Sequence, residues 1–315
     1  MNSKKILSLV LAGVMALCVT GCVNQHPEET TSTNESREVR LVATSPAVVQ
    51  ICNRLDLDLV GICQSTSDLP ERYDGVTTVG MAMNPDLEII KSLDPDYILS
   101  PATLQNDLQP KYASIGVSSL FLNLKSVEGM YASIGVSSLF LNLKSVEGMY
   151  ASIEGLGEKF GREEEAAVML EEFDSFMTEF AEKNAGKESP KVLVLMGLPG
   201  SYIIATDNSY VGSLVKFAGG TNVYGDGDGQ EFLFANTEDM KTKEPDVILR
   251  AAHGLPEEAR KMFAEEFSTN DIWQHFKAVQ EGRVYDLDSN LFNMSANFSY
   301  EEALKALQPM LCGEE

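Results

Sequence analysis

Apolar residues from position 40 onward form short continuous runs that alternate with longer stretches of helical spacing. Continuous aliphatic runs are typical of buried parallel strands. The runs are 40–44, 59–63, 97–101 and 119–124 in the first half, and 191–197, 246–251 and 283–287 in the second. The helical stretches between them are 47–55, 85–93, 102–115, 209–217, 257–267 and 270–279. This alternation predicts parallel α/β layers.

One helical stretch is longer than the others and divides the alternation into two parts. Apolar residues recur there every three or four positions over 161–185, and the remaining positions are mostly Glu and Lys. We therefore expect an α/β fold of two Rossmann-like lobes, residues 39–160 and 190–312, joined by a single backbone helix.

Two segments 150 residues apart are similar in sequence. Residues 88–99 and 238–249 share six identities, including the Glu that opens each segment and the Pro-Asp pair near its middle. In both, a predicted helix leads through Pro-Asp into a buried strand. General features of helix-to-strand connections account for part of this similarity, but the matched Glu and Lys positions favour pseudo-symmetric lobes.

The first 22 residues precede this pattern and have a different character. Lys4 and Lys5 are followed by an apolar stretch, and small residues then lead to Cys22. This order is typical of a signal peptide, here a lipoprotein signal over 1–21 with lipid attached to Cys22. The alternative is an ordinary signal that contains a cysteine. Residues 22–38 are polar and lack aromatic side chains, which predicts a flexible tether.

Charge and cysteine content bear on the kinds of partner and of metal site that the chain can have. The formal net charge of −23 argues against nucleic acid or an anionic membrane surface as a partner. Cys52, Cys63 and Cys312 lack the spacing of a metal or haem-attachment motif. We expect buried free thiols, with a Cys52–Cys63 disulfide as the alternative.

Two side chains that can bind metals follow strands at matching places in the two halves. Ligands of parallel α/β sheets bind beyond the carboxyl ends of the strands. Met83 follows a short predicted strand near 77–79, and we expect Asn84 to cap the next helix with Pro85 in its first turn. His253 follows the strand at 246–251. A thioether and an imidazole facing each other across a cleft suit the two axial positions of haem iron, although either residue alone is more commonly structural.

Other kinds of site have less support. A zinc or manganese site needs three or four His or carboxylate ligands, and beyond the tether the chain has only His253 and His275. We expect His275 to be structural, in an amphipathic helix. The acidic, Gly-rich stretch 224–230 lacks the distal Glu of a calcium loop, so we expect a surface loop. The chain has no nucleophile elbow, Walker motif or dinucleotide fingerprint, which favours binding over catalysis.

Four stretches resemble the haem-binding lipoproteins of the iron-regulated surface haem-uptake systems of Gram-positive bacteria. They are 79–100, 191–223, 236–279 and 283–288. The resemblance implies a class III substrate-binding protein, with two lobes on a rigid helix. It also implies a monomeric, lipid-anchored receptor on the outer face of the cell membrane. Such a receptor takes haem from a surface donor protein and delivers it to the permease dimer of an ABC transporter. A receptor for a ferric siderophore or a corrinoid is the alternative, and an enzyme or adhesin on the same fold is a second.

The resemblance also implies which residues hold the haem. The family's axial methionine directly precedes a helix-start motif, which selects Met83 over Met81. Its axial histidine stands in the segment that contains His253. The family's propionate-binding backbone groups correspond to Ala47 and to the loop of Ser65, Thr66 and Ser67.

The resemblance further implies two docking residues. Glu88 and Glu238 match positions that, in the wider class, contact arginines of the membrane permease. Their placement at the same point of the two similar segments favours docking over an ordinary solvated surface.

An exact tandem duplication interrupts the first lobe. Residues 112–130 recur letter for letter at 131–149. Each copy contains one strand-like SLFLNL segment, and we expect Ser126 or Ser145 to cap the helix that follows. The family pattern passes through this strand and helix once. We therefore expect one copy to occupy the normal place and the other to bulge out, with an extra edge strand as the alternative. The letter-perfect identity indicates a recent event or an error of sequence assembly.

Overall fold

The computed structural model describes residues 38–65, 68–121, 136–253 and 255–313. The predicted signal peptide and Cys22 lie outside these residues, and so do the tether up to residue 37, Thr66, Ser67 and Ser126. Residues Val39–Glu315 form one compact unit. No helix within the described ranges is both long enough and apolar enough to cross a membrane.

The first half of this unit is built on a parallel six-stranded sheet with the order β3-β2-β1-β6-β8-β7. Its strands are β1 (Leu41–Ala43), β2 (Gly61–Ile62), β3 (Thr77–Thr78), β6 (Tyr97–Pro101), β7 (Ser118–Phe121) and β8 (Ser137–Leu141). Its helices are α1 (Pro46–Arg54), α2 (Leu87–Ser92), α3 (Gln105–Ser114) and α4 (Val146–Phe160), with 3-10 turns at Glu71–Tyr73 and Ala102–Leu104. The parallel layer predicted for this half is confirmed.

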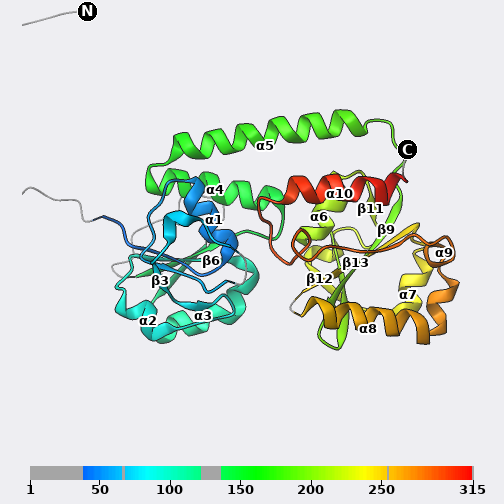
Figure 1. Ribbon diagram of the computed structural model, residues 1–315, viewed down its shortest axis with the longest axis horizontal. Coiled ribbons are helices and arrows are strands. Elements are labelled where there is room, and N and C mark those ends of the chain that lie inside the picture. The colour runs from blue at the N-terminus through cyan, green and yellow to red at the C-terminus, as the bar shows by residue number, and fades with distance from the viewer. Residues whose placement is uncertain (1–37, 66–67, 122–135, 254, 314–315) are drawn as a thin grey trace, which may run out of the picture. The chain divides into compact units, whose positions relative to one another are not determined.

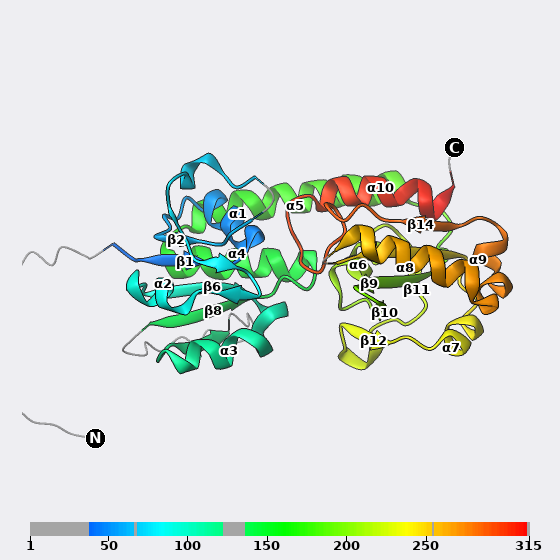
Figure 2. The ribbon, with the colours of Figure 1, turned by 60° about the horizontal axis from the view of Figure 1, so that its bottom comes forward.

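Alternation along the strands of this sheet fills two separate cores. Leu41 and Leu99 belong to a hydrophobic cluster with residues of α1 and α4. Their neighbours Val42 and Ile98 belong to a second cluster with residues of α2 and α3. Successive side chains of a strand point to opposite faces, so each strand supplies both cores. The result is a sheet between two layers of helices (Figures 1 and 2).

The second half contains a mixed sheet with the order β12-β10-β9-β13-β14, and β11 also pairs with β9. Its strands are β9 (Lys191–Leu198), β10 (Ser201–Ala205), β11 (Thr221–Asn222), β12 (Phe232–Phe234), β13 (Val247–Ala252) and β14 (Val284–Asp286). Its helices are α6 (Tyr210–Phe217), α7 (Thr237–Thr242), α8 (Pro256–Thr269), α9 (Lys277–Gln280) and α10 (Tyr300–Cys312), with 3-10 turns at Gly227–Gly229 and Asp271–His275. The antiparallel strand β10 and the helix α10 were not predicted. The helix predicted over 270–279 is wrong, because a 3-10 turn followed by the four-residue α9 occupies those positions.

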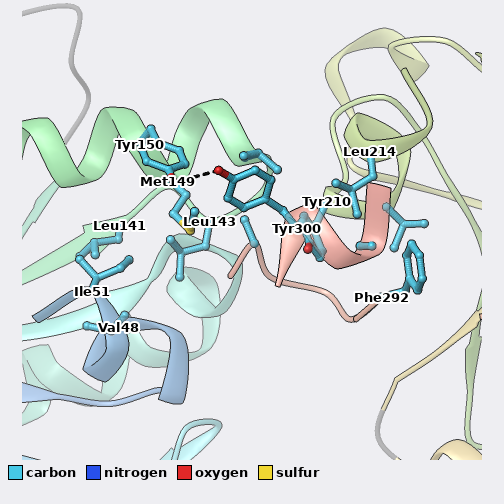
Figure 3. Close-up of a cluster of buried hydrophobic side chains, with 14 of the residues drawn as sticks. Val48, Ile51, Leu141, Leu143, Met149, Tyr150, Tyr210, Leu214, Phe292 and Tyr300 are labelled. Atoms are coloured by element: carbon cyan, nitrogen blue, oxygen red, sulfur yellow. Dashed lines mark hydrogen bonds between the residues drawn. The ribbon is translucent and has the colours of Figure 1, made fainter. Parts of the chain in front are cut away.

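A long helix, α5 (Glu163–Asn184), packs against helices of both halves (Figure 1). Phe173 of α5 stacks on Tyr150 of α4 with the ring centroids 4.3 Å apart. Phe176 lies edge-on to Tyr300 of α10 at 5.7 Å. The hydroxyls of Tyr150 and Tyr300 are 3.2 Å apart, within hydrogen-bond distance (Figure 3). One hydrophobic cluster therefore runs from α1 and α4 through α5 to α6 and α10.

The two similar segments found in the sequence have the same local structure. Asp96 accepts a hydrogen bond from the backbone N–H of Arg40 at 2.8 Å, and Asp246 accepts one from that of Lys191 at 3.0 Å. Each aspartate thereby fixes the start of the strand beside its own. The residue two positions before each aspartate has a positive φ, 46° at Asp94 and 49° at Glu244. The matched sequences thus form matched helix–turn–strand units, α2–β6 and α7–β13.

The duplicated segment provides two adjacent strands of the first sheet. Strand β7 comes from the first copy and pairs in parallel with β8 from the second, so that Ser118 lies beside Ser137 and Phe121 beside Phe140. Each residue thus pairs with its own repeat, 19 positions later. The expectation that the spare copy bulges out is wrong for 118–121, because the free edge of β8 offers backbone hydrogen-bonding groups that an identical strand can pair with. The rest of that copy, 122–130, lies outside the described residues.

The second copy leads directly into α4. Ser145 caps this helix, since its hydroxyl accepts a hydrogen bond from the Gly148 N–H at 3.1 Å. Of the two predicted caps, Ser145 is therefore confirmed.

Candidate functional site

Met83 lies at the tip of a small β-hairpin between β3 and α2. Strands β4 (Gly80–Met81) and β5 (Asn84–Pro85) pair antiparallel, and Ala82 and Met83 form the two-residue turn between them. The prediction that Asn84 caps a helix beginning at Pro85 is wrong. Asp86 is the cap, because its carboxylate accepts hydrogen bonds from the N–H groups of Glu88 and Ile89, each at 3.0 Å.

The base of this hairpin is fixed by two backbone hydrogen bonds. The carbonyl of Gly80 accepts a hydrogen bond from Gln64 N–H at 2.7 Å, and Asp86 N–H donates to the Val79 carbonyl at 2.7 Å. Gly80 has a φ of +91°, and an added Cβ would lie 3.1 Å from the Asp86 nitrogen. A residue with a side chain rarely adopts that φ, so glycine is required where the hairpin begins.

Met83 lies on the surface of the protein. It is 60% exposed, and Met81 on the adjoining strand is 64% exposed. Exposed methionines are uncommon in monomeric domains, because the side chain gains from burial. Both methionines are exposed, so the choice of Met83 over Met81 rests on the sequence resemblance.

His253 directly follows β13, as the sequence predicts. Its backbone N–H donates to the carbonyl of Gly197 at 2.9 Å, which extends the pairing of β13 with β9 by one residue. The side chain is half-buried, and this burial lowers the pKa of the imidazole below its ordinary value. The neutral imidazole, whose nitrogen lone pair can bind a metal, is therefore the favoured form at neutral pH.

Arg250, three residues before His253, is engaged within the protein. Its guanidinium binds the Asp286 carboxylate through two hydrogen bonds, of 2.8 and 2.7 Å. It also lies over the rings of Phe267 and Phe263, at 4.8 and 5.6 Å from their centroids. A bidentate pair of this kind satisfies the planar guanidinium. Arg250 therefore supports the end of β13 and is not free to bind an anionic ligand.

The two propionate-binding stretches predicted from the resemblance are partly described. Ala47 occupies the second position of α1, after the cap Ser45 and Pro46. N–H groups in the first turn of a helix have no intrahelical acceptor, and no acidic side chain lies in this turn. Ser65 is half-buried, at the end of the described loop.

Glu88 and Glu238 occupy equivalent places in the two halves. Each is the second residue of its helix, α2 or α7, and each is exposed. Asn236 caps α7 as Asp86 caps α2, by accepting a hydrogen bond from a first-turn N–H. The matching positions in the sequence thus become matching surface positions.

The other positions considered in the sequence, His275 and the stretch 224–230, do not form a metal site among the described residues. His275 is exposed, at the end of a 3-10 turn. Within the described ranges, no three His, Cys, Asp or Glu side chains come together as a metal site. The Gly-rich stretch 224–230 forms turns and one 3-10 segment.

Sequence reasoning missed two contacts around the candidate ligands. One is the Arg250–Asp286 pair, whose members are 36 residues apart. The other is a bond from the Lys111 ammonium to the backbone of Met83 at 3.1 Å. Neither has a sequence signal, because each depends on how separate elements pack.

Comparison with known proteins places the whole unit in a family. The model of a family described as periplasmic binding proteins matches residues 41–291. The chain is 39% identical to the high-affinity heme uptake system protein IsdE of Staphylococcus aureus strain Newman, over 96% of each chain.

Two solved structures share both fold and sequence with this chain. An ABC transporter substrate-binding protein from Listeria monocytogenes EGD-e superposes with a TM-score of 0.78 and is 44% identical, covering 88% of this chain and 100% of its own. S. aureus IsdE complexed with heme superposes with a TM-score of 0.76 and is 39% identical, covering 87% of this chain and 99% of its own.

Proposed function

This chain belongs to the periplasmic binding proteins, and from that premise we propose that it is a haem receptor that serves an ABC importer. The observation that carries the proposal is 39% identity, over 96% of both chains, to a protein named for high-affinity heme uptake. The structural similarity to that protein in complex with heme adds support. The relatives are named as transport and substrate-binding proteins, so the proposed role is capture and delivery of a ligand.

We propose further that Met83 and His253 are the axial ligands of the haem iron. Met83 contributes an exposed thioether at a hairpin tip. His253 contributes an imidazole that burial keeps neutral. Ferric and ferrous haem accept this pair of ligands, and both residues follow sheet strands, in the position where ligands of α/β sheets bind.

The haem carboxylates have a suitable partner in α1. Free N–H groups and the positive end of a helix dipole attract anions, and the first turn of α1 offers both at Ala47. We propose that Ala47, with the loop of Ser65, Thr66 and Ser67, holds the propionates.

A ferric siderophore or a corrinoid is the alternative ligand. Anionic siderophores are commonly bound by several arginines, and the arginine nearest in sequence to His253 is already paired with Asp286. This pairing disfavours the siderophore.

The experiment that tests the proposal is a titration of the apoprotein with haemin, a ferric siderophore and a corrinoid, followed by absorbance and fluorescence. We expect haemin to bind most tightly. Met83→Ala and His253→Ala should each weaken binding and alter the Soret band, whereas the matched variants Met81→Ala and His275→Ala should bind like the wild type. Wild-type spectra and affinity in both ligand variants would refute the site, and tighter binding of another ligand would refute the function.

The location and partners are also proposals. We propose that lipid on Cys22 anchors the protein to the outer face of the membrane, that a surface protein supplies the haem, and that Glu88 and Glu238 dock on the permease dimer. Metabolic labelling with palmitate should mark the wild type but not Cys22→Ala.

Replacing both Glu88 and Glu238 with Lys should abolish haem uptake while leaving haem binding intact. Uptake at the wild-type rate would remove the docking role.

A further inference from the structure

The hairpin that carries Met83 is too short to hold its own tip in place. Its strands have two residues each and are joined by a two-residue turn. The backbone bonds to Gln64 and Val79 fix only its base. An isolated hairpin of this length is not stable in water, so the direction of the Met83 side chain depends on contacts at the tip.

One side chain from another element makes such a contact. The ammonium of Lys111 on α3 donates to the Met83 carbonyl at 3.1 Å and to Asn84 Oδ1 at 3.2 Å. Both acceptors are at the tip. A charged donor makes a stronger hydrogen bond than a neutral one, and here it joins two successive residues of the hairpin.

The helix that carries Lys111 is well anchored. The next residue, Tyr112, is fully buried, and its hydroxyl lies 2.9 Å from the hydroxyl of Ser100, the fourth residue of β6. Lys111 thereby connects the tip of a short hairpin to a helix that packs on the sheet through buried residues.

We propose that Lys111 is a positioning residue, which fixes the backbone of Met83 so that its thioether is held ready to bind iron. The inference rests on the proposed function of Met83 as an axial ligand. Without the ammonium, the tip samples other conformations, and binding then costs the ordering of those residues. A different role for the same charge is direct contact with a haem propionate, and the two roles predict different results.

The first test uses the apoprotein and does not depend on haem. Amide hydrogen exchange of residues 80–85 should be faster in Lys111→Ala than in the wild type, and Lys111→Arg, which keeps a charged donor, should recover part of the protection. Lys91→Ala, at an exposed lysine in the last turn of α2, is the matched control. Unchanged exchange in Lys111→Ala would overturn the inference.

The second test compares haem complexes. In Lys111→Ala we expect haem to dissociate about threefold to tenfold faster, the effect of one lost hydrogen bond. The absorption and resonance Raman features of the iron–thioether bond should weaken towards those of Met83→Ala. The double variant should match Met83→Ala alone, because Lys111 acts through Met83.

Two results would overturn the inference in different ways. An equal loss of affinity with and without Met83 would show that Lys111 contacts the ligand directly. A normal spectrum in Met83→Ala would refute Met83 as the ligand and with it the role of Lys111. That failure of the proposed function is distinguishable, because the exchange test reports on the Lys111 contact alone.

Discussion

Burial determines the chemistry of the three cysteines in the described chain. Cys52 and Cys63 are buried free thiols, as expected, and burial raises the pKa of each to about 12. The expectation of burial is wrong for Cys312, which is exposed in the last turn of α10. The sequence pattern did not reveal α10, so it did not show that this cysteine ends a surface helix.

These environments predict how the thiols react. In a soluble form that begins after Cys22, a thiol reagent at pH 8 should modify one cysteine per native molecule, and Cys312→Ser should abolish that reaction. Cys52 and Cys63 should react only after unfolding, because their thiolates are both inaccessible and disfavoured. Reaction of two or three thiols in the native protein would contradict this burial.

Residue type and position made Met83 and His253 candidates, but the choice of Met83 over Met81 came from the resemblance. Met83 and His253 both follow predicted strands, and the structure places them so. The local structure of Met83 could not be identified, because Asn84 and Asp86 are both good caps and Pro85 suits a first helical turn. Asp86 is the cap because its carboxylate accepts hydrogen bonds from two N–H groups.

At the scale of elements, the two helix–turn–strand units share a strained turn. Glu244 has a φ of +49°, and its counterpart Asp94 has one of +46°. The left-handed region costs a residue with a Cβ about 1–2 kcal/mol, and Asp tolerates it better than Glu does. The strain should therefore be greater at Glu244.

Glu244→Gly relieves this strain and should stabilise the protein. We expect the free energy of unfolding to rise by about 0.5–1 kcal/mol, after the greater chain entropy of glycine is subtracted. Asp94→Gly should raise the free energy of unfolding by less, because aspartate tolerates the left-handed conformation better than glutamate does. Urea denaturation of both variants measures the difference. If Glu244→Gly were less stable than the wild type, the Glu244 side chain would contribute more stability than its left-handed conformation costs.

We expect the extra strand β7 to be dispensable for the fold of the first sheet. Deletion of 112–130 leaves one copy, whose YASI segment continues α3 and whose strand remains β8 beside β6. Because the connection shortens and no site residue is removed, we expect haem binding to be retained and thermal stability to be equal or slightly higher. Failure of the deletion variant to fold would show that β7 is required.

Element order was predicted better than element type. The strand at 97–101 matches β6 in full, and its run of aliphatic residues is unambiguous. Strand β10 was missed because it belongs to a hairpin that follows β9 after two residues, where the sequence does not resemble a parallel crossover. The prediction of a helix at 270–279 was wrong because the buried Trp273 lies at the centre of a 3-10 turn, Asp271–His275.

At the scale of the whole unit, a charged pair connects the two sheets. Lys144, just after β8, lies 3.3 Å from Glu231, just before β12. The Glu231 side chain is only 13% exposed, and its other oxygen has no hydrogen-bond partner among the described residues. Burial raises the pKa of Glu231, and the Lys144 ammonium opposes part of that rise.

The sign of the pH effect follows from that raised pKa. Folding favours the protonated carboxyl, so the contribution of Glu231 to stability is present below its unfolded pKa and is lost as the pH rises through the higher folded pKa. Removal of Lys144 increases this loss at neutral pH, because it leaves a buried carboxylate without its partner.

Lys144→Met should therefore lower the free energy of unfolding at pH 7 by about 1–3 kcal/mol. The deficit should shrink as the pH falls towards 5, and it should vanish when Glu231→Gln is added. The control is Lys183→Met, which breaks an exposed pair with Glu179 and should change stability by about 0.5 kcal/mol or less. Urea denaturation from pH 5 to 8 gives these values. Equal, pH-independent losses in the two Lys variants would contradict the role of burial.

The arrangement of the lobes had little sequence signal beyond the long helix. The Lys144–Glu231 pair and the Tyr150–Tyr300 contact join residues 87 and 150 positions apart, and nothing in their local sequence indicates a partner. The two lobes and the helix α5 could be predicted from the sequence, because they depend on local periodicity. The contacts between lobes depend on packing that only the folded chain reveals.

The hydrophobic cluster shared by α4, α5, α6 and α10 also bears on biosynthesis. Tyr300, Leu304 and Leu307 of α10 belong to this cluster, yet α10 is synthesised after the other helices that contribute to it. Until α10 is made, Phe176 of α5 lacks its edge-on partner Tyr300, and α6 lacks the neighbouring helix α10. This part of the interior therefore cannot form until residues 300–312 have been made, and we expect a chain that stops before residue 300 to be less stable.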